Sequence, residues 1–314
     1  MANTKNFVTK GPVEIEKTAS LTAGTVSTGA SEGYYLGGAS YTSKSKDVTS
    51  QTNLPTGMAL SSDGTKMYII SSSGYKCWQY SLSTAWDVST ATYAFKSFNF
   101  PEVVSARSIT FKPDGTKLYI AESYSSVDSI FAYNLSTAGD VSTATYGSEN
   151  ESVAAQDSEP LAVEFNSDGT KMYVLGAAND SVFQYSLSTA YNVSTSTYDS
   201  VSFSLSSQTT YSSGLRFNAD GTKMYVGSFL PDEIYQYSLS TAYDLSTASY
   251  DNVSFDFSAQ EGTIYGFDWG DNGTKLYLVG TSTDTVYQYS AELATVELDL
   301  STGDIFNPVG DINY

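Results

Sequence analysis

Apolar and polar residues alternate over short segments that recur along most of the chain. In one copy, residues 214–218 alternate before an Ala-Asp-Gly turn, residues 222–227 alternate after it, and residues 233–239 form a third segment. Residues 200–206, Ser-Val-Ser-Phe-Ser-Leu-Ser, represent a fourth type. A period of two places successive side chains on opposite faces of a strand. Each copy is therefore predicted to form four short antiparallel strands, the first two joined as a hairpin.

These segments belong to a repeat of about 52 residues that occurs five times. The hexapeptide Asp-Gly-Thr-Lys-Met/Leu-Tyr begins at Asp63, Asp114, Asp168 and Asp220, and a variant with Asn in first place begins at Asn272. A second motif, close to Gln-Tyr-Ser-Leu-Ser-Thr-Ala-Tyr-Asp, follows each hexapeptide. Four antiparallel strands repeated five times predict an all-β fold, a five-bladed β-propeller. The Asp-Gly pairs are interpreted as turn residues, and no metal site is expected, because the loops lack the Asp spacing of a calcium site.

The order of the segments predicts how the ring closes. Residues 41–51 align with residues 250–260, so one outer-strand segment precedes the first hairpin, and the last copy lacks its own. We therefore expect residues near 43–50 to form the outer strand of the last blade. This closure leaves no strand edge open between the first and last blades.

Three domains follow from this closure: an N-terminal attachment arm and linker (1–40), the propeller (41–290) and a C-terminal β-segment (291–314). Residues 13–16 and 296–300 both alternate with period two. We expect the C-terminal segment to pair with the N-terminal arm and the two to attach the propeller to something larger.

The net charge of the chain limits which partners are expected. The chain carries 34 acidic and 15 basic residues, a formal net charge of −19. An acidic surface repels phosphate groups, so neither nucleic acid nor an anionic membrane surface is expected as a partner. The first ten residues lack the apolar core of a secretory signal, and no 18-residue apolar run occurs. We predict synthesis without a signal peptide and no membrane insertion.

The chain has no histidine and a single cysteine, Cys77. The missing histidine excludes the Ser-His-Asp triad and a His-ligated zinc site. A lone cysteine inside a strand segment is expected to be a buried apolar residue. We therefore predict that the chain needs no cofactor and is not an enzyme.

The repeat resembles those of propellers in virion structural and fibre proteins of tailed phages, and is distantly similar to YVTN and lactonase-type propeller repeats. The segment from Val296 to Phe306 is similar to one near the ends of phage structural proteins, and the segment from Asn6 to Gly11 resembles the start of a phage fibre protein. The resemblance implies a head- or tail-attached virion protein, located on the particle surface. It also implies contacts with other virion proteins through residues 1–40 and 291–314, and a homo-oligomer in the particle.

Two kinds of loop vary among the five copies: those that enter the first strand and those that join the second and third strands. In a four-stranded blade both kinds lie on one face. Aromatic rings beside hydrogen-bonding groups suit sugar recognition. Packing of these aromatic residues on their own blades is the alternative interpretation. The residues of this predicted ligand-binding face are Tyr75, Tyr124, Asp157, Glu159, Tyr211, Phe229, Glu233 and Tyr265.

Superposing the five first strands places Ala59, Thr110, Glu164, Arg216 and Asp268 at one equivalent position. Two carboxylates facing a common space are what a glycosidase needs, so Glu164 and Asp268 are the alternative catalytic residues. The other interpretation is an inter-blade ion network in which Arg216 bridges Glu164 and Asp268.

The sequence thus favours a virion structural protein of a tailed phage, with possible contact to host surface polysaccharide through the variable loops. Two alternatives stay open. One is a glycan-active hydrolase, and the other is a free lectin-like binding propeller.

Overall fold

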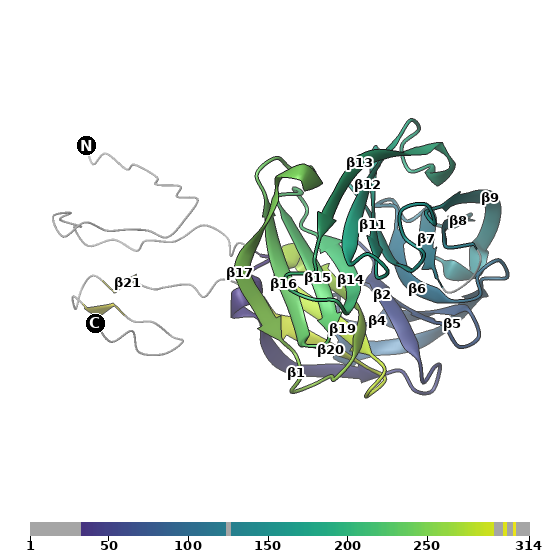
Figure 1. Ribbon diagram of the computed structural model, residues 1–314. Coiled ribbons are helices and arrows are strands. Elements are labelled where there is room, and N and C mark those ends of the chain that lie inside the picture. The colour runs from purple at the N-terminus through teal and green to yellow at the C-terminus, as the bar shows by residue number, and fades with distance from the viewer. Residues whose placement is uncertain (1–32, 124–126, 292–297, 300–303, 306–314) are drawn as a thin grey trace, which may run out of the picture. The chain divides into compact units, whose positions relative to one another are not determined.

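The computed structural model describes residues 33–123 and 127–291, together with the backbone of residues 298–299 and 304–305. Five four-stranded antiparallel sheets form the blades of a β-propeller (Figure 1). The predicted all-β fold and the number of blades are confirmed. In the described part of the chain, no helix is both long and apolar enough to span a membrane.

Each blade follows the strand order predicted from the repeat. Blade 1 consists of β2 (Pro55–Leu60), β3 (Lys66–Ser71), β4 (Lys76–Leu82) and β5 (Ala91–Asn99). Blade 2 consists of β6 (Ala106–Phe111), β7 (Lys117–Glu122), β8 (Ser129–Leu135) and β9 (Ala144–Ser152). Blade 3 consists of β10 (Pro160–Phe165), β11 (Lys171–Gly176), β12 (Ser181–Leu187) and β13 (Ser196–Ser204). Blade 4 consists of β14 (Ser212–Phe217), β15 (Lys223–Phe229), β16 (Asp232–Leu239) and β17 (Ala248–Asp256).

Blade 5 closes the ring with strands from both ends of the propeller. It contains β18 (Ile264–Gly270), β19 (Lys275–Gly280) and β20 (Thr285–Ser290), and its outer strand is β1 (Ser40–Asp47). β1 pairs antiparallel with β20, and Figure 1 shows the purple and yellow strands side by side. The predicted closure through residues near 43–50 is confirmed.

A two-stranded sheet lies outside the propeller. β21 (Leu298–Asp299) pairs antiparallel with β22 (Asp304–Ile305), and both belong to a unit separate from the blades. The predicted pairing of the C-terminal segment with the N-terminal arm lies outside the described residues. So do most of the two segments predicted to attach the propeller to other proteins.

The Asp-Gly hairpin turns are held by their own side chains. Asp63 accepts hydrogen bonds at Oδ1 from the backbone N–H and the hydroxyl of Thr65. The same pair of bonds recurs at Asp114, Asp168 and Asp220. The glycine that follows has a positive φ, +68° at Gly64, which a residue with a Cβ rarely adopts. The turn interpretation of these motifs therefore has a local physical basis.

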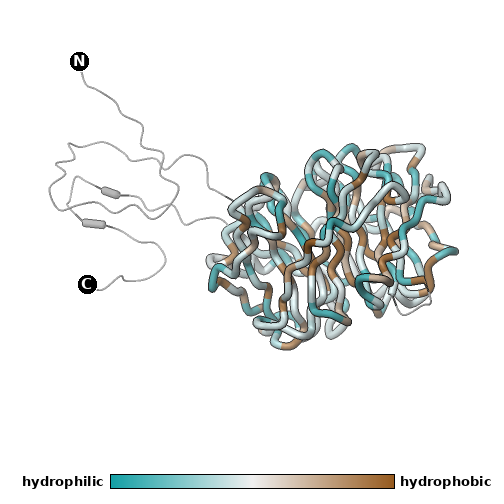
Figure 2. The backbone as a smooth tube through the Cα atoms, turned by 45° about the horizontal axis from the view of Figure 1, so that its top comes forward, coloured by the Kyte–Doolittle hydropathy of each residue, from teal (hydrophilic) through white to brown (hydrophobic). Residues whose placement is uncertain are grey.

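The core consists of layers between neighbouring blades. In the described residues there are five clusters of buried apolar side chains, and each combines residues of two adjacent blades. Figure 2 shows the hydrophobic stretches within the strands and the hydrophilic ones mainly at their connections. Cys77 is fully buried in one of these layers, and burial raises the pKa of its thiol. Each blade is thus stabilised by its neighbours, and an isolated blade would expose both of its faces.

A ring of five tyrosines links the blades through hydrogen bonds. Each second strand carries one fully buried tyrosine, whose hydroxyl donates to a backbone carbonyl of the next blade. The pairs are Tyr68 with Gly139, Tyr119 with Tyr191, Tyr173 with Tyr243, Tyr225 with Tyr34, and Tyr277 with Trp86. The five acceptors all have positive φ. We call these five contacts the tyrosine latches.

Tyr34 completes this ring from the N-terminal side of β1. Its backbone N–H donates to Gly273, as that of Trp86 does to Gly64 in blade 1. A short 3-10 helix, η1 (Leu36–Gly38), follows, where the other blades have one of the helices η2 (Val88–Thr90), η3 (Val141–Thr143), η4 (Val193–Thr195) and η5 (Leu245–Thr247). The residues just before β1 therefore replace the third-to-fourth-strand connection that the last repeat lacks.

Candidate functional site

The propeller has two faces with different loops. The turn face carries the hairpin turns between first and second strands and the connections between third and fourth strands. The loop face carries the connections between second and third strands and those that lead into the next blade.

At the axis, one arginine contacts all five first strands. The register pairs Ala59, Thr110, Glu164, Arg216 and Asp268 with the five latch tyrosines, so these residues are structurally equivalent. Arg216 lies 2.5 Å from Glu164 (Nη1 to Oε1) and 2.9 Å from Asp268 (Nε to Oδ1). Its Nη2 donates to the carbonyls of Met58 and Ile109, and its Nη1 also donates to its own neighbour Leu215.

The two carboxylates differ in how fully they are compensated. Besides Arg216, Asp268 accepts from the backbone N–H groups of Leu60 and Trp269. Burial raises the pKa of Glu164 to about 7, although the charge of Arg216 acts in the opposite direction. One guanidinium serving two buried carboxylates leaves one negative charge uncompensated, so retaining a proton on Glu164 relieves the repulsion. This geometry fits an inter-blade ion network, because both candidate catalytic carboxylates bind the same arginine.

The loop face brings three of the predicted ligand-binding residues together. Tyr211 and Phe229 have ring centroids 5.4 Å apart, and Phe229 and Tyr265 are 5.9 Å apart. Tyr211 is 45% exposed, whereas Phe229 and Tyr265 are half-buried. We call these three residues the loop-face aromatic cluster. It spans blades 4 and 5.

The other predicted residues of this face have different surroundings. Tyr75 is exposed on blade 1, and Glu159 and Glu233 are half-buried. Tyr124 lies outside the described residues. Asp157 is buried, with 1% exposure.

Asp157 organises a loop from within. Its carboxylate accepts from the backbone N–H groups of Glu159, Ala178 and Asn179. It occupies the space above Gly176, where an added Cβ would come within 2.2 Å of the carboxyl carbon. The side chain therefore points into the protein and does not present its oxygens to a ligand on the surface.

The repeats carry a signal for this role that our comparison of the loops missed. In blade 5, Glu261 takes the place of Asp157 and Gly280 that of Gly176, with the same backbone-binding pattern. Blades 1 and 4 instead have hydrogen-bonded hydroxyl pairs at these two positions, Thr52 with Ser71 and Thr209 with Ser228. The residues at the two positions thus vary together. Where the first is acidic the second is glycine, and where the first is threonine the second is serine, as expected for two side chains that fill the same space.

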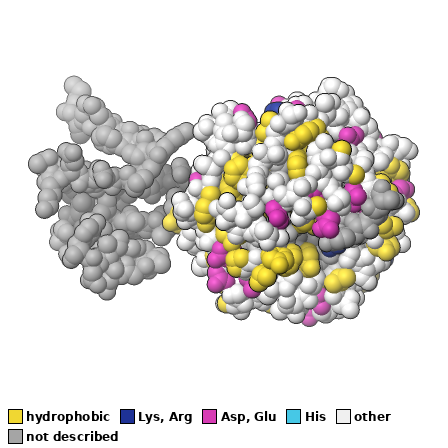
Figure 3. Space-filling model, viewed as in Figure 1, with side chains coloured by type: hydrophobic (Ala, Val, Ile, Leu, Met, Phe, Trp, Pro, Cys, Tyr) yellow, Lys and Arg dark blue, Asp and Glu magenta, His cyan; other side chains and the backbone are white. Residues whose placement is uncertain are grey.

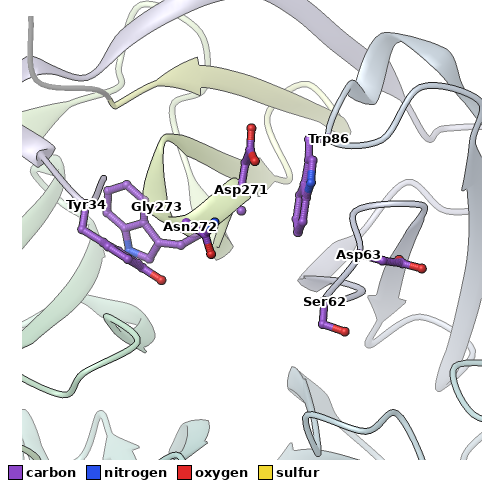
Figure 4. Close-up of a pocket in the computed structure, with 9 residues that line it drawn as sticks. Tyr34, Ser62, Asp63, Trp86, Asp271, Asn272 and Gly273 are labelled. Atoms are coloured by element: carbon purple, nitrogen blue, oxygen red, sulfur yellow. The ribbon is translucent and has the colours of Figure 1, made fainter. Parts of the chain in front are cut away.

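The turn face holds a cavity that was not predicted from the sequence. It has a volume of about 320 Å³ and lies where blade 5 meets blade 1. Figure 4 shows Trp86 and Tyr34 on opposite sides of Asp271 and Asn272. Trp269 also lines the cavity, so two of the three tryptophans of the chain meet here. We call it the junction cavity.

A second cavity of about 480 Å³ shares several of these residues and extends to the axis. Its lining includes Glu164, Arg216 and Asp268, and also Gly139 in blade 2. Gly139 stands where the other blades have an aromatic residue after the Ser-Thr-Ala motif, or Tyr34 in blade 5. An added Cβ at Gly139 would lie 2.9 Å from Nζ of Lys66, so this lysine fills part of the space where the other blades have an aromatic ring.

The described residues contain no group of three or more acidic or cysteine side chains that could hold a metal ion. The molecular surface in Figure 3 carries scattered Asp and Glu side chains and few Lys or Arg. At the turn face, the larger cavity also has Lys66, Lys112 and Arg216 among its lining residues.

Neither a family model nor a curated protein sequence matches the chain. Among solved structures, a Bacteroides uniformis protein provisionally named 6-phosphogluconolactonase is 15% identical, with a TM-score of 0.47, over 81% of this chain and 69% of that chain. A similarly named protein from Bacteroides fragilis is 17% identical, with a TM-score of 0.47, over 80% and 68%. The periplasmic gluconolactonase of Pseudomonas aeruginosa is 13% identical, with a TM-score of 0.44, over 75% and 66%. These matches agree with the distant similarity to lactonase-type propellers, and at this identity they concern the fold alone.

The comparisons correct one prediction, that the chain is not an enzyme. Among the similar structures are proteins with gluconolactonase names. The prediction was derived from the absence of histidine and of cysteine clusters, which excludes particular catalytic groups and not catalysis by carboxylates. We therefore withdraw it.

Proposed function

We propose that the chain is a virion structural protein of a tailed phage and that its propeller contacts glycans of the host surface. The observation that carries the proposal is the distribution of exposed apolar side chains. In the described residues nine large hydrophobic side chains are exposed, and six of them lie on the loop face. They are Leu54, Tyr75, Val104, Val127, Tyr211 and Leu230. Exposed apolar groups concentrated on one face are typical of an interaction surface.

The loop-face aromatic cluster gives this surface a chemistry suited to sugars. The apolar faces of pyranose rings stack on aromatic side chains, and neighbouring polar groups bind the hydroxyls. Tyr211 supplies an exposed ring, and the half-buried Glu233 is on β16 at the same face. A host polysaccharide is therefore the ligand that we propose for the loop face.

Attachment to a particle is supported by the sequence resemblance. Both the repeats and the segments near the two ends resemble those of phage structural proteins. We propose that residues 1–40 and 291–314 contact other virion proteins and that several copies assemble in one particle. Such an arrangement multiplies weak glycan contacts through avidity.

The proposal is tested with purified particles and with the isolated protein. Mass spectrometry is expected to find the chain in a fixed ratio to the other particle proteins, and its absence from particles would contradict the virion role. Tyr211→Ala and Leu230→Ala are each expected to weaken binding to host polysaccharide by about tenfold. Tyr35→Ala, which removes an exposed aromatic residue from the turn side of blade 5, is the matched control. If the isolated protein binds polysaccharide but purified particles do not contain it, the free lectin-like alternative is the correct one.

A glycan-active hydrolase is the second candidate, because Glu164 lines the larger cavity and its raised pKa keeps a proton available near neutral pH. The ion pairs with Arg216 oppose this candidate, since they engage both carboxylates. The decisive variant is Glu164→Gln with Asp268→Asn. Hydrolysis of a glycan by the native protein, lost in this variant while its fold is retained, would establish the second candidate. Unchanged hydrolysis would remove it.

A further inference from the structure

We propose that the junction cavity on the turn face is a binding site for a neutral saccharide unit. This site is separate from the loop-face surface and does not depend on it. The five-fold repeat shows which features of the cavity the fold itself requires. Features of the cavity that the other four blades lack are not required by the fold and need another explanation.

The residue at position 86 is larger than its counterparts. Tyr191 and Tyr243 occupy the equivalent positions in blades 3 and 4, and each covers the hairpin glycine of its own blade. Trp86 covers Gly64 in the same way, but its indole also reaches Gly270 of blade 5. An added Cβ at Gly270 would lie 2.7 Å from the indole ring. Blade 5 therefore has glycine where an extended tryptophan from blade 1 needs space.

The hairpin turn of blade 5 also departs from the repeat. In the other blades an aspartate accepts hydrogen bonds from the threonine two residues later. Asn272 takes that position, and within the described residues its carboxamide has no hydrogen-bond partner. Figure 4 shows this side chain in the space between Trp86 and Tyr34. An uncommitted carboxamide offers both a donor and an acceptor, as recognition of a hydroxyl requires.

The charges of the cavity exclude most other ligand classes. The negative potential of Asp63 and Asp271, in a chain with a net charge of −19, disfavours an anion. Asp271 pairs with Lys275, whereas Asp63 accepts hydrogen bonds from Ser61 and Thr65 and keeps its negative charge. An organic cation is bound most tightly where aromatic rings enclose it, and this open cavity lacks such a cage.

A neutral polyhydroxyl ring is the ligand class that matches the remaining groups of the cavity. Trp86 and Tyr34 offer aromatic surface to the apolar face of a pyranose. Asn272 and the exposed Ser62 are available to its hydroxyls, and each carboxylate retains an oxygen that can accept. The volume of about 320 Å³ is at the lower end for small-molecule sites, which suits one or two sugar units.

The repeat supplies matched variants. Trp86→Gly introduces the residue that blade 2 has at this position, Gly139, and Tyr243→Gly makes the same change in blade 4, outside both cavities. Asn272→Asp introduces the residue of the other four hairpins into a turn where Asp271 and Asn272 both have positive φ, a conformation that Asp adopts more readily than most residues. The probe is an array of neutral, anionic and cationic saccharides, followed by titration of the best binder with tryptophan fluorescence as the readout.

We expect the full chain to bind a neutral saccharide with a change in tryptophan emission. Trp86→Gly should weaken binding at least about tenfold, Asn272→Asp should weaken it less, and Tyr243→Gly should leave it unchanged. Equal affinities of the Trp86→Gly and Tyr243→Gly proteins would overturn the inference, as would the lack of any neutral binder on the array. Binding lost in Tyr211→Ala and kept in both Trp86→Gly and Asn272→Asp would place the sugar on the loop face. That result would support the proposed function and reject this site.

Discussion

Two rings of equivalent side chains run around this propeller, and they are built on opposite principles. In the tyrosine latches all five blades use the same residue on the second strand, and each latch joins one blade to the next. At the axis all five blades use different residues, and a single one of them, Arg216, contacts every first strand.

The difference follows from what each ring must satisfy. A latch involves only two blades, so the same solution can be used five times. The first strands converge on one space, where five copies of a charged residue would repel and five copies of a small one would leave a void. One long side chain with five N–H donors, surrounded by acceptors from the other blades, satisfies both requirements. A repeat protein can thus be symmetric between neighbours and must lose its symmetry where all the repeats meet.

The largest effect is expected at the axis. Arg216→Met should lower the free energy of unfolding by about 3–5 kcal/mol, because it removes the cation that both carboxylates share and leaves two backbone carbonyls without their donor, while Asp268 keeps its bonds to Leu60 and Trp269. Urea denaturation measures the change. The only other arginine, Arg107, donates to Ser123 and is the control, and Arg107→Met is expected to cost less than Arg216→Met because Arg107 does not bridge two carboxylates at the axis. Equal losses in the two variants would show that the axis is no more demanding than an ordinary contact.

Glu164 gives the axis a pH dependence that the latches lack. Its pKa is raised by burial to about 7 in the folded protein, from its ordinary value of 4.5. Between these values the folded state holds a proton that the unfolded state has released, so the contribution of Glu164 to stability is greatest at low pH and falls as pH rises towards 7. The integrated loss is up to about 3 kcal/mol, at about 1.4 kcal/mol per unit of pKa shift.

Glu164→Gln isolates this contribution, since glutamine does not titrate. Stability measured by urea denaturation between pH 4.5 and pH 7.5 should fall more steeply for the native protein than for the variant. Asp128 and Asp180 also have a pKa raised by burial, but they are present in both proteins and cancel in the comparison. Parallel pH profiles would mean that Arg216 keeps Glu164 ionised throughout.

The contrast between the rings also explains what could be predicted from the sequence. Blades, turns and closure follow from the repeated motifs because they depend on contacts within a blade or with its neighbour. The common position of Glu164, Arg216 and Asp268 could be found by superposing the repeats. Tyr34 could not, since it carries no motif and is recognisable only by the backbone bond to Gly273 that it shares with its counterparts.

The candidate binding sites also differ in how far they could be predicted from the sequence. The loop-face aromatic cluster was predicted from the variable loops, whereas Asp157 on the same face proved to be buried. The junction cavity was not predicted, because its main feature is the contact of Trp86 with Gly270. These two residues lie far apart in the chain and meet only after the ring has closed. Departures from a repeat are visible in a sequence, but their partners become visible only when the closure is known.

The smallest loss of stability is expected when the hydrogen bond of one tyrosine latch is removed. Comparing two latches tests whether they are equivalent. Tyr225→Phe removes the bond to Tyr34, which joins residues 191 positions apart, and Tyr119→Phe removes one that spans 72 positions. Each change should cost about 1 kcal/mol, the value of one buried hydrogen bond, whatever the distance along the chain. Urea denaturation and amide hydrogen exchange together measure this. The exposed Tyr211 gives the control, since Tyr211→Phe should change stability by less than about 0.5 kcal/mol. If Tyr225→Phe left global stability unchanged and accelerated exchange only in β1 and the strands of blade 5, closure would be a separate, weaker step, and the five latches would not be equivalent.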